Sequence, residues 1–289
     1  MAWGIISDIH ANLQALEAVL EAMGEVEGVL CLGDVVGYGA DPVECCRVVR
    51  QLAPLVLLKG NHEAGVLEEL PLSWFSRHAL LALIWTRSNL PPKWTDFLST
   101  FALRASLSED MTTTQSGADN APAPDSPAGI LLVHGSLDEP YDYLDSSWKA
   151  NQLLAQTEAK FSFFGHTHFA GWFESRQEAP ASRATAPKSK RRRRFGDITE
   201  VLGGDNACRW TPCPEGGLLR LEKDVRYVIN CGSVGQPRDG NPEAAFGLFD
   251  PVQRAVEFRR VGYDVEGAQE RIRRAGLPDV LAERLTYGL

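Results

Sequence analysis

The sequence predicts an α/β protein built from layers of sheet and helix, and three observations support this prediction. Short apolar or β-branched runs alternate with amphipathic segments of helical length, as in β-α-β units. Polar residues follow most of these runs. The 289 residues are 44% hydrophobic and 23% charged, a balance typical of soluble globular proteins. We expect a single domain, 1–289, because one layered α/β domain with insertions reaches this length.

Five apolar runs predict strands in the first part of the chain. They are WGIIS, GVLCLG, LVLLKG, GILLVHG and FSFFG. Between the first two runs, apolar residues recur at helical spacing from Leu13 to Met23, and Asn12 or Ser7 can satisfy the helix start. A second helix is predicted in DPVECCRVVRQL, with Asp41 as its N-cap and Pro42 at its first position.

The chain after Asn230 has a different pattern. The strand-like pieces AAFGLFD and AVEFRRVGYD, with turn residues between them, predict antiparallel pairing and a second sheet. The tail, 265–289, is predicted to be helical. Two polar segments, 108–128 and 175–217, are predicted to be flexible insertions. The second carries the basic run Arg191–Arg194, for which a solvated loop is favoured over a nucleic-acid site or a nuclear-import signal.

Charge and cysteine content narrow the class of protein. The net charge of -9 argues against general polyanion binding. No apolar stretch reaches the roughly 18 residues that span a bilayer, and MAWGIISD lacks the features of a secretory leader. We therefore expect a cytoplasmic protein that binds neither membranes nor nucleic acid. The six cysteines lack the paired CxxC spacing of a zinc site, so buried thiols are favoured over a Cys208–Cys213 disulfide.

Five of the six histidines fall directly after predicted strands. They are His10 in SDIH, His62 in GNHE, His134 in VHG, and His166 and His168 in GHTH. The carboxyl ends of strands in an open α/β sheet form one rim, where ligand sites are built. This rim is expected to gather eight side chains: Asp8, His10, Asp34, Asn61, His62, His134, His166 and His168. The sixth histidine, His78, lies in a helix-like segment outside any motif and is expected to make structural contacts.

The residue types at this rim indicate a metal centre. Imidazole combined with carboxylate and amide oxygens favours manganese, iron, zinc or nickel over calcium. Without His62 the set still offers seven ligands, too many for one four-coordinate zinc and suited to two ions with open positions. Two metals roughly 3.5–4 Å apart form a clamp for in-line displacement at phosphorus. The sequence therefore predicts phosphate ester hydrolysis with two divalent transition-metal ions, manganese being favoured.

The ordered motifs SDIH, GDVVGYG, GNHE, VHG and GHTH resemble the signature of the calcineurin-like metallophosphoesterase superfamily. This resemblance implies an α/β-β-α sandwich of two mixed sheets flanked by helices. The later NCGSVGQPRDG, at 230–240, is similar to the segment that closes the fold in small bacterial and archaeal phosphodiesterase members. Five motifs at successive strand ends are specific, although each motif alone is weak.

The resemblance also implies a role for each rim residue. Asp8, His10, Asp34 and His168 would surround one metal, and Asp34, Asn61, His134 and His166 would surround the other. Asp34 would bridge the ions, and a hydroxide shared by them would attack phosphorus. His62 would stabilise the developing charge or protonate the leaving oxygen, a task suited to a side chain that titrates near neutral pH.

Two positions depart from the pattern of the superfamily. Gly37 and Tyr38 stand where protein serine/threonine phosphatases and symmetrical dinucleotide tetraphosphatases carry an Asp-Arg pair, which weakens those two interpretations. Cys231 stands where close phosphodiesterase relatives usually have proline, and no role is predicted for it. Arg238 is a candidate for substrate phosphate because its guanidinium can grip oxyanions in a bidentate manner, a surface salt bridge being the alternative.

Other residues have structural interpretations beside functional ones. Trp74, Trp85 and Trp94 are expected to pack adjoining helices rather than to stack bases. Glu63 either orients a neighbour or serves as the acidic residue of a helix start.

The sequence therefore predicts a phosphoesterase that acts on phosphodiesters or small phosphorylated metabolites. One alternative is a nucleotide or dinucleoside polyphosphate hydrolase. Another is a non-catalytic metal-binding scaffold for a partner protein, which the retention of His62 disfavours.

Overall fold

The computed structural model describes residues 2–52, 55–109, 111, 114–117, 129–176 and 208–289. The basic run Arg191–Arg194 and most of the two expected insertions lie outside these residues. In the part of the chain that is described, no helix is long and apolar enough to cross a membrane.

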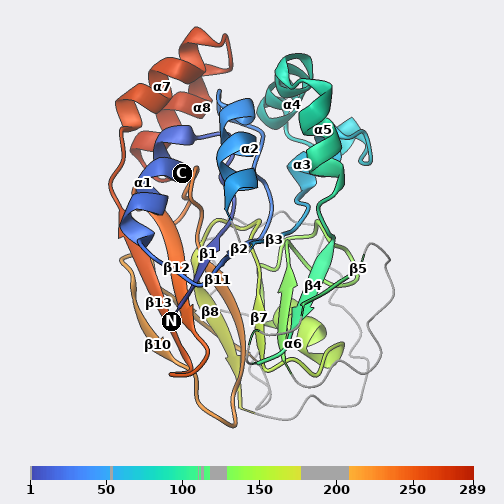
Figure 1. Cartoon of the computed structure of the whole chain (residues 1–289), viewed down its shortest axis with the longest axis vertical. Coiled ribbons are helices and arrows are strands. Elements are labelled where there is room, and N and C mark those ends of the chain that lie inside the picture. The colour runs from blue at the N-terminus through green and yellow to red at the C-terminus, as the bar shows by residue number, and fades with distance from the viewer. Residues whose placement is uncertain (1, 53–54, 110, 112–113, 118–128, 177–207) are drawn as a thin grey trace.

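The first sheet contains the amino-terminal strands. Its order is β10-β13-β12-β1-β2-β3 (Figure 1). The strands are β10 (Gly217–Arg220), β13 (Ala255–Val261), β12 (Ala244–Asp250), β1 (Trp3–Ile6), β2 (Val29–Cys31) and β3 (Leu55–Leu57). β1, β2 and β3 are parallel, with Gly4 opposite Val29, whereas β12 runs antiparallel to β1, with Trp3 opposite Phe249.

The second sheet has the order β5-β4-β6-β7-β11-β8-β9. The strands are β5 (Thr114–Gly117), β4 (Arg104–Leu107), β6 (Ile130–Val133), β7 (Phe161–Phe163), β11 (Arg226–Cys231), β8 (Ala170–Ser175) and β9 (Arg209–Pro212). β6, β7 and β11 are parallel, and their neighbours pair antiparallel. Both sheets are mixed, as the resemblance implied.

The helices cover the outer faces of the two sheets. They are α1 (Leu13–Met23), α2 (Pro42–Gln51), α3 (Asn61–Val66), α4 (Arg77–Asn89), α5 (Pro92–Ser99), α6 (Ser147–Ala155), α7 (Val265–Arg274) and α8 (Asp279–Glu283), with 3-10 turns η1 (Leu72–Trp74) and η3 (Arg284–Thr286). Asn12 caps α1 by accepting a hydrogen bond from the Ala15 N–H. Asp41 precedes α2 as predicted but makes no side-chain cap, because its carboxylate pairs with Arg271 of α7.

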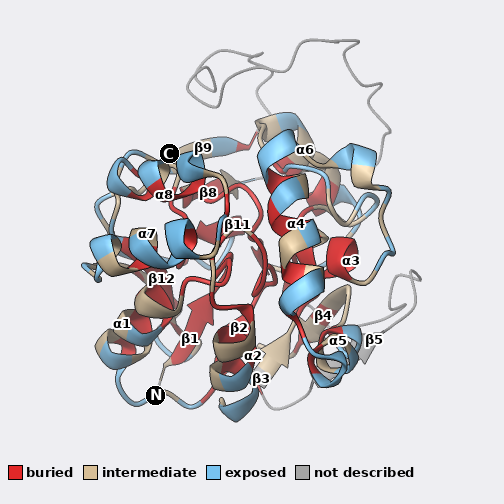
Figure 2. Ribbon diagram, turned by 90° about the horizontal axis from the view of Figure 1, so that it is seen from above, coloured by how far each residue is buried: buried red, intermediate tan, exposed pale blue. Residues whose placement is uncertain are grey.

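The alternating direction of side chains along each strand determines how the sheets and helices pack into layers. In β1, Ile5 belongs to the apolar cluster between the two sheets and Ile6 to the cluster beneath α1 and α2. Successive strand residues point to opposite faces, so both faces of this sheet are buried. Phe164 and Val228 pack under α6 on the far side of the second sheet. Figure 2 shows the result, with buried strands inside and exposed helix surfaces outside.

The arrangement of strands corrects two sequence-based expectations. The pieces at 244–261 pair antiparallel, as predicted, but they extend the first sheet through β12 and β1 instead of forming a second one. The five predicted strands do not share one sheet either, because β6 and β7 lie in the other sheet. The apolar pattern identifies a buried strand, but it carries no information about which strand will be its neighbour.

The two segments predicted to be flexible insertions contain ordered structure where they are described. Within 108–128, Met111 packs in the core between the sheets, and 114–117 forms β5. Within 175–217, 209–212 forms β9 beside β8. The remaining parts, 118–128 and 177–207, lie outside the described residues.

The predictions for the tryptophans, the cysteines and His78 are confirmed only in part. Trp94 is buried and Trp85 packs against a core cluster, whereas Trp74 is 58% exposed, so the packing expectation is wrong for Trp74. All six cysteines are free, and Cys231 packs against the bare Cα of Gly247. His78 is exposed on α4, where it lines a groove of about 500 Å³ that none of the eight rim residues lines.

Candidate metal centre

The eight rim residues converge where the carboxyl ends of the two sheets meet. Asp8 and His10 follow β1, Asp34 follows β2, and Asn61 and His62 begin α3 after β3. From the second sheet, His134 follows β6, while His166 and His168 follow β7. The prediction of one rim in one sheet is therefore wrong, but the predicted gathering of the side chains is found. Two sheets packed face to face bring their strand ends to a common edge.

The backbone is strained at most of these positions. Asp8, His10, Asp34, His166 and His168 all have φ between 50° and 64°, the left-handed region. Such φ values are uncommon outside glycine and cost on the order of 1–3 kcal/mol each. Strain concentrated in five neighbouring polar residues indicates that these loops are shaped for a site rather than for stability.

Glu63 holds the Asp34 loop in place. Its carboxylate is buried and accepts hydrogen bonds from the backbone N–H groups of Asp34 (2.8 Å), Val36 (3.1 Å) and Gly60 (2.8 Å). Both interpretations of this residue are confirmed, because Glu63 orients the Asp34 loop and is also the acidic first-turn residue of α3 that accepts from its N-cap, Gly60. Burial, with the nearby Asp34 charge, raises the pKa of Glu63 to about 7.

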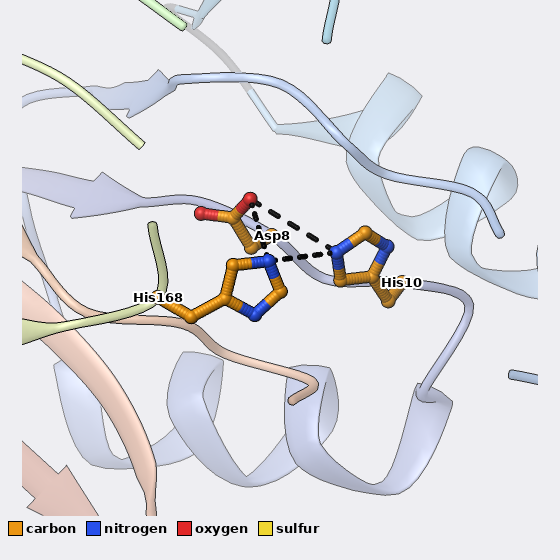
Figure 3. Close-up of side chains that lie close together, drawn as sticks. All are labelled: Asp8, His10 and His168. Carbon is orange, nitrogen blue, oxygen red and sulfur yellow. Dashed lines mark hydrogen bonds and ion pairs between the residues drawn. The ribbon is translucent and has the colours of Figure 1, made fainter. Parts of the chain in front are cut away.

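The first group of candidate ligands comprises Asp8, His10 and His168 (Figure 3). The Nε2 atoms of His10 and His168 are 3.2 Å apart, and Asp8 Oδ1 lies 3.3 Å from the Nε2 of His168. The side chains point toward one another, and one ligand atom from each lies within 4.8 Å of the others. This is the spacing of donors around a single ion.

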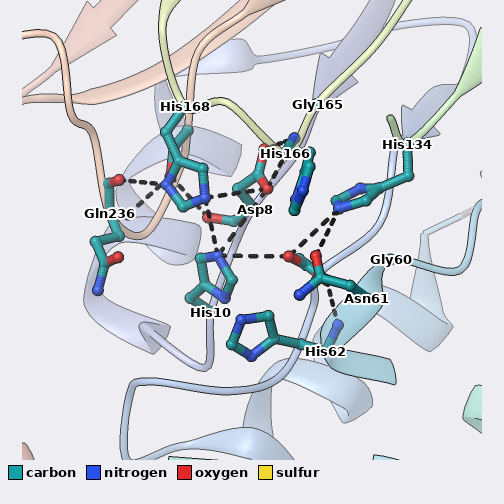
Figure 4. Close-up of polar contacts among 12 residues, drawn as sticks. Asp8, His10, Gly60, Asn61, His62, His134, Gly165, His166, His168 and Gln236 are labelled. Carbon is teal, nitrogen blue, oxygen red and sulfur yellow. Dashed lines mark hydrogen bonds and ion pairs between the residues drawn. The ribbon is translucent and has the colours of Figure 1, made fainter. Parts of the chain in front are cut away.

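The second group comprises Asp34, His134 and His166. Figure 4 labels His134 and His166, with Asn61 beside them. Asp34 Oδ2 lies 3.4 Å from the Nε2 of His134, and Asn61 Oδ1 lies 3.3 Å from the same nitrogen. Asp34 Oδ2 is also 3.7 Å from the Nε2 of His10, which belongs to the first group. The Asp34 carboxylate therefore lies between the two groups.

Backbone carbonyls orient three of the histidines. The Nδ1 atoms of His10, His134 and His168 lie 3.2, 2.7 and 2.6 Å from the carbonyl oxygens of Val36, Leu32 and Gln236, respectively. A carbonyl can only accept, so each Nδ1 carries a proton and each Nε2 points into the cluster, where the neutral ring offers its lone pair. This arrangement is typical of histidines that bind metals.

The two carboxylates have opposite pKa shifts. Burial raises the pKa of Asp8 to about 7. Burial acts in the same direction on Asp34, but the neighbouring histidines, led by His134, outweigh it and hold the pKa of Asp34 well below its ordinary value. In His134, burial lowers the pKa, but the charges of Asp34 and Asp8 outweigh it and raise the pKa to about 9.

Burial lowers the pKa of the other histidines of the cluster. His10, His166 and His168 are held well below their ordinary pKa, so their rings are neutral and free to donate lone pairs. Burial also lowers the pKa of His62 to about 4.

The donor set fits divalent transition-metal ions. The Nε2 of His166 is buried without a hydrogen-bond partner among the described residues. No lysine or arginine of the described chain lies within 4.0 Å of the buried carboxylates of Asp8 and Asp34. Neutral imidazoles, converging carboxylates and an amide oxygen leave a requirement for positive charge that such ions satisfy.

One wall of the site comes from two tyrosines to which the sequence assigned no role. Tyr38 lies against His10 and His62, with ring centroids 4.6 and 4.5 Å apart, and Tyr143 stacks on His166 at 4.1 Å. Tyr143 lies in a long irregular loop, where no periodicity singles it out.

Arg238 faces the Tyr38 wall and the metal-ligand cluster. Its guanidinium lies 5.7 Å from the ring centroid of Tyr38. Burial lowers the pKa of Arg238, but Tyr38, Tyr143 and Asp8 outweigh that effect and raise it. The alternative of a surface salt bridge is not met, because no described carboxylate lies within 4.0 Å of Arg238.

Comparison with known proteins places this geometry in a family. The calcineurin-like phosphoesterase superfamily domain matches residues 1–197. An uncharacterized protein of Methanocaldococcus jannaschii is 30% identical over 293 residues, which cover 98% of this chain and 97% of that protein. The metallophosphoesterase of Sphaerobacter thermophilus is similar in structure with a TM-score of 0.74 and 31% identity, covering 100% of this chain and 99% of that one. A hypothetical protein of Pyrococcus horikoshii shares the fold at a TM-score of 0.67 and 16% identity, covering 100% and 98%.

A two-sheet sandwich whose strand ends gather histidines and carboxylates defines a metal-dependent phosphoesterase. The chain belongs to the calcineurin-like phosphoesterase superfamily. The resemblance drawn from the five sequence motifs is confirmed, and so is the sandwich of two mixed sheets.

Proposed function

We propose that the protein hydrolyses phosphodiesters or small phosphorylated metabolites at a centre of two divalent transition-metal ions. The observation that supports this most strongly is the position of Asp34. Its Oδ2 lies 3.7 Å from His10 Nε2 in one ligand group and 3.4 Å from His134 Nε2 in the other. A carboxylate between two sets of nitrogen donors can serve two ions at once.

Each group would hold one ion. Asp8, His10, Asp34 and His168 would bind the first ion, and Asp34, Asn61, His134 and His166 would bind the second. Two such ions supply an attacking water of lowered pKa and neutralise the charge on the phosphoryl oxygens. Manganese is favoured by the mixed nitrogen and oxygen donors, with iron, zinc and nickel also matching them.

The protein's own residues orient the substrate. The backbone N–H of His62 donates to Asp34 Oδ1 at 2.8 Å, which fixes the start of α3 beside the ligands. The His62 ring, packed between His10 and Tyr38, serves as a hydrogen-bond donor to a phosphoryl or leaving oxygen. Arg238 provides charge-assisted hydrogen bonds to an anionic group of the substrate.

Hydrolysis by metal-stripped protein tests this function. The protein is re-supplied separately with manganese, zinc, iron or magnesium and assayed on bis(p-nitrophenyl) phosphate and p-nitrophenyl phosphate. We expect a transition metal to restore activity. Both Asp34→Asn and His62→Ala are expected to lower kcat/KM at least a hundredfold, the scale seen when a group that stabilises transition-state charge is lost.

Matched controls separate the site from general effects. His78→Ala removes an exposed histidine of α4, and Asp96→Asn removes an exposed carboxylate of α5, so both should retain the wild-type rate. Stoichiometric metal binding without hydrolysis of any ester would refute the proposal and favour a scaffold.

A further inference from the structure

Arg238 is anchored beside the ligands, yet part of its guanidinium has no protein partner. Its backbone N–H donates to the carbonyl of His168 at 3.3 Å, and its Nη2 donates to Gln236 Oε1 at 2.9 Å. Its Nε is buried without a hydrogen-bond partner among the described residues. The side chain is therefore held in place and retains a donor for a ligand.

A second arginine, Arg284, approaches the same wall from the end of the chain. It opens the 3-10 turn after α8, where the neighbouring Leu285 packs in one apolar cluster with Tyr38. The Gly240 N–H donates to the Gly288 carbonyl at 3.0 Å, which ties this segment to the Arg238 loop. Burial, followed by the positive charge of Arg238, lowers the pKa of Arg284 to about 10.

Several other arginines of the fold pair with a carboxylate. Arg260 pairs with Asp239, Arg271 with Asp41 and Arg87 with Glu68. In the described structure no aspartate or glutamate side chain lies within 4.0 Å of Arg238 or Arg284, and the Nε of Arg284 donates to a main-chain oxygen of Leu289, the last residue of the sequence. Like charges held in one region of the fold repel, and an anion bound between them offsets that repulsion.

The balance of charge indicates what kind of anion belongs there. Two divalent ions outweigh the carboxylates of Asp8 and Asp34 by two positive charges, which one phosphoryl dianion balances. Arg238 and Arg284 add two further positive charges. A substrate with a single phosphoryl group carries no negative charge to balance the two arginines.

We propose that Arg238 and Arg284 form an anion subsite next to the metal centre, specific for substrates that carry a second phosphate or carboxylate. Tyr143, stacked on His166, forms the adjoining wall. This inference rests on the proposed phosphoesterase function and narrows its substrate class to phosphate esters with two anionic groups. Guanidinium pairs recognise such oxyanions through bidentate, charge-assisted hydrogen bonds.

Three alkyl esters with similar leaving groups test the subsite in the manganese-loaded protein. They are propyl phosphate, 3-phosphooxypropanoate and propane-1,3-diyl bisphosphate. We expect kcat/KM to be at least tenfold higher for one or both doubly anionic esters, and the preferred one identifies the second group as carboxylate or phosphate. Arg284→Met should reduce that preference about tenfold or more. Arg284→Lys should reduce it less, because lysine keeps the positive charge but cannot form the bidentate hydrogen bonds of a guanidinium.

The control is Arg47→Met, which removes the same charge from an exposed position on α2 and should leave the preference unchanged. Equal kcat/KM for all three esters in the wild type would overturn the subsite. The same fractional loss on every ester in Arg284→Met would also overturn it.

A binding measurement separates this inference from the hydrolytic function. Calorimetry compares propane-1,3-bisphosphonate with propylphosphonate, neither of which is hydrolysed. Tighter binding of the bisphosphonate, lost in Arg284→Met and partly kept in Arg284→Lys, supports the subsite even if no ester is cleaved. Equal affinities for the two phosphonates contradict it even in an active enzyme.

Discussion

At the residue scale, the strained backbone positions coincide with the candidate metal ligands. Asp8, Asp34 and three of the histidines adopt left-handed φ, and such conformations persist only when the surrounding structure enforces them. Glu63 provides part of that enforcement for Asp34 through three backbone hydrogen bonds across two loops. The site is therefore held in shape before any ligand is bound.

Gly37 provides a test of how closely His62 is positioned. A Cβ at Gly37 would lie 2.0 Å from His62 Nδ1, and its φ is +91°. We expect Gly37→Ala to displace the imidazole and lower kcat at least tenfold, with metal content unchanged. The left-handed φ should also cost about 1 kcal/mol of unfolding free energy, measured by denaturant titration.

Gly276→Ala is the matched control for this prediction. Gly276 has φ +72°, and a Cβ there would meet nothing within 4 Å. This variant should lose a similar amount of stability and keep full activity. Equal loss of kcat in both variants would show that strain, rather than displacement of His62, is responsible.

Much of the site could be predicted at this scale. Eight polar residues follow recognisable strands, so the sequence alone predicted that they gather. Tyr38, Tyr143 and Arg284 could not be assigned in the same way. They come from loops and a short turn whose positions depend on contacts with distant segments.

At the element scale, Arg226 of β11 holds the end of α6. Its guanidinium donates to the carbonyl oxygens of Leu154 (2.8 Å), Ala159 (2.9 and 3.1 Å) and Thr157. Carbonyls at a helix C-terminus lack intrahelical partners and carry partial negative charge. Arg226 therefore satisfies groups that would otherwise require water.

We expect Arg226→Met to lower the unfolding free energy by about 2–3 kcal/mol, because all the hydrogen bonds from the charged guanidinium to the backbone carbonyls are lost at once. Chemical denaturation measures this loss. Arg226→Lys should recover part of the stability, because an ammonium group reaches fewer carbonyls. Activity per folded molecule should not change in either variant. An unchanged denaturation midpoint in Arg226→Met would contradict this account.

The apolar pattern of the sequence predicted where strands and helices occur, but it did not predict which strands pair with each other. The predicted strands and the helices at 13–23 and 42–51 are present. The antiparallel pair at 244–261 was assigned to the wrong sheet, because alternation along β12 and β13 fits either side of the sandwich equally well. Pairing depends on where long connections return the chain, which periodicity does not encode.

At the scale of the whole molecule, the candidate ligands link the two sheets. Asp8, His10 and Asp34 follow strands of the first sheet, whereas His134 and His166 follow strands of the second. An ion that binds both sets stabilises the docking of the sheets as well as supporting chemistry. Binding at a free concentration about 100 times the Kd adds about 2.7 kcal/mol to the folded state.

Removal of metal should therefore lower Tm. We expect a chelator to reduce the melting temperature of manganese-loaded protein by about 5–10 °C, since 1 kcal/mol corresponds to about 2–4 °C in a larger domain. Differential scanning calorimetry measures the shift. In Asp34→Asn, which lacks the carboxylate between the ligand groups, the shift should be smaller. An identical Tm with and without metal would indicate that metal does not couple the sheets.

The sequence by itself determined β1, β2, β3, β6, β7, β12 and β13, the α/β class, the eight converging polar residues and their resemblance to metallophosphoesterases. These features are local, because apolar periodicity and the residues directly after a strand can be read in order. The tertiary structure alone decided that the site lies where two sheets meet, and it alone brought the segment of Arg284 against the loop of Arg238. The reason is physical: packing one sheet on another joins residues far apart in the chain, and only the folded core fixes which ones meet.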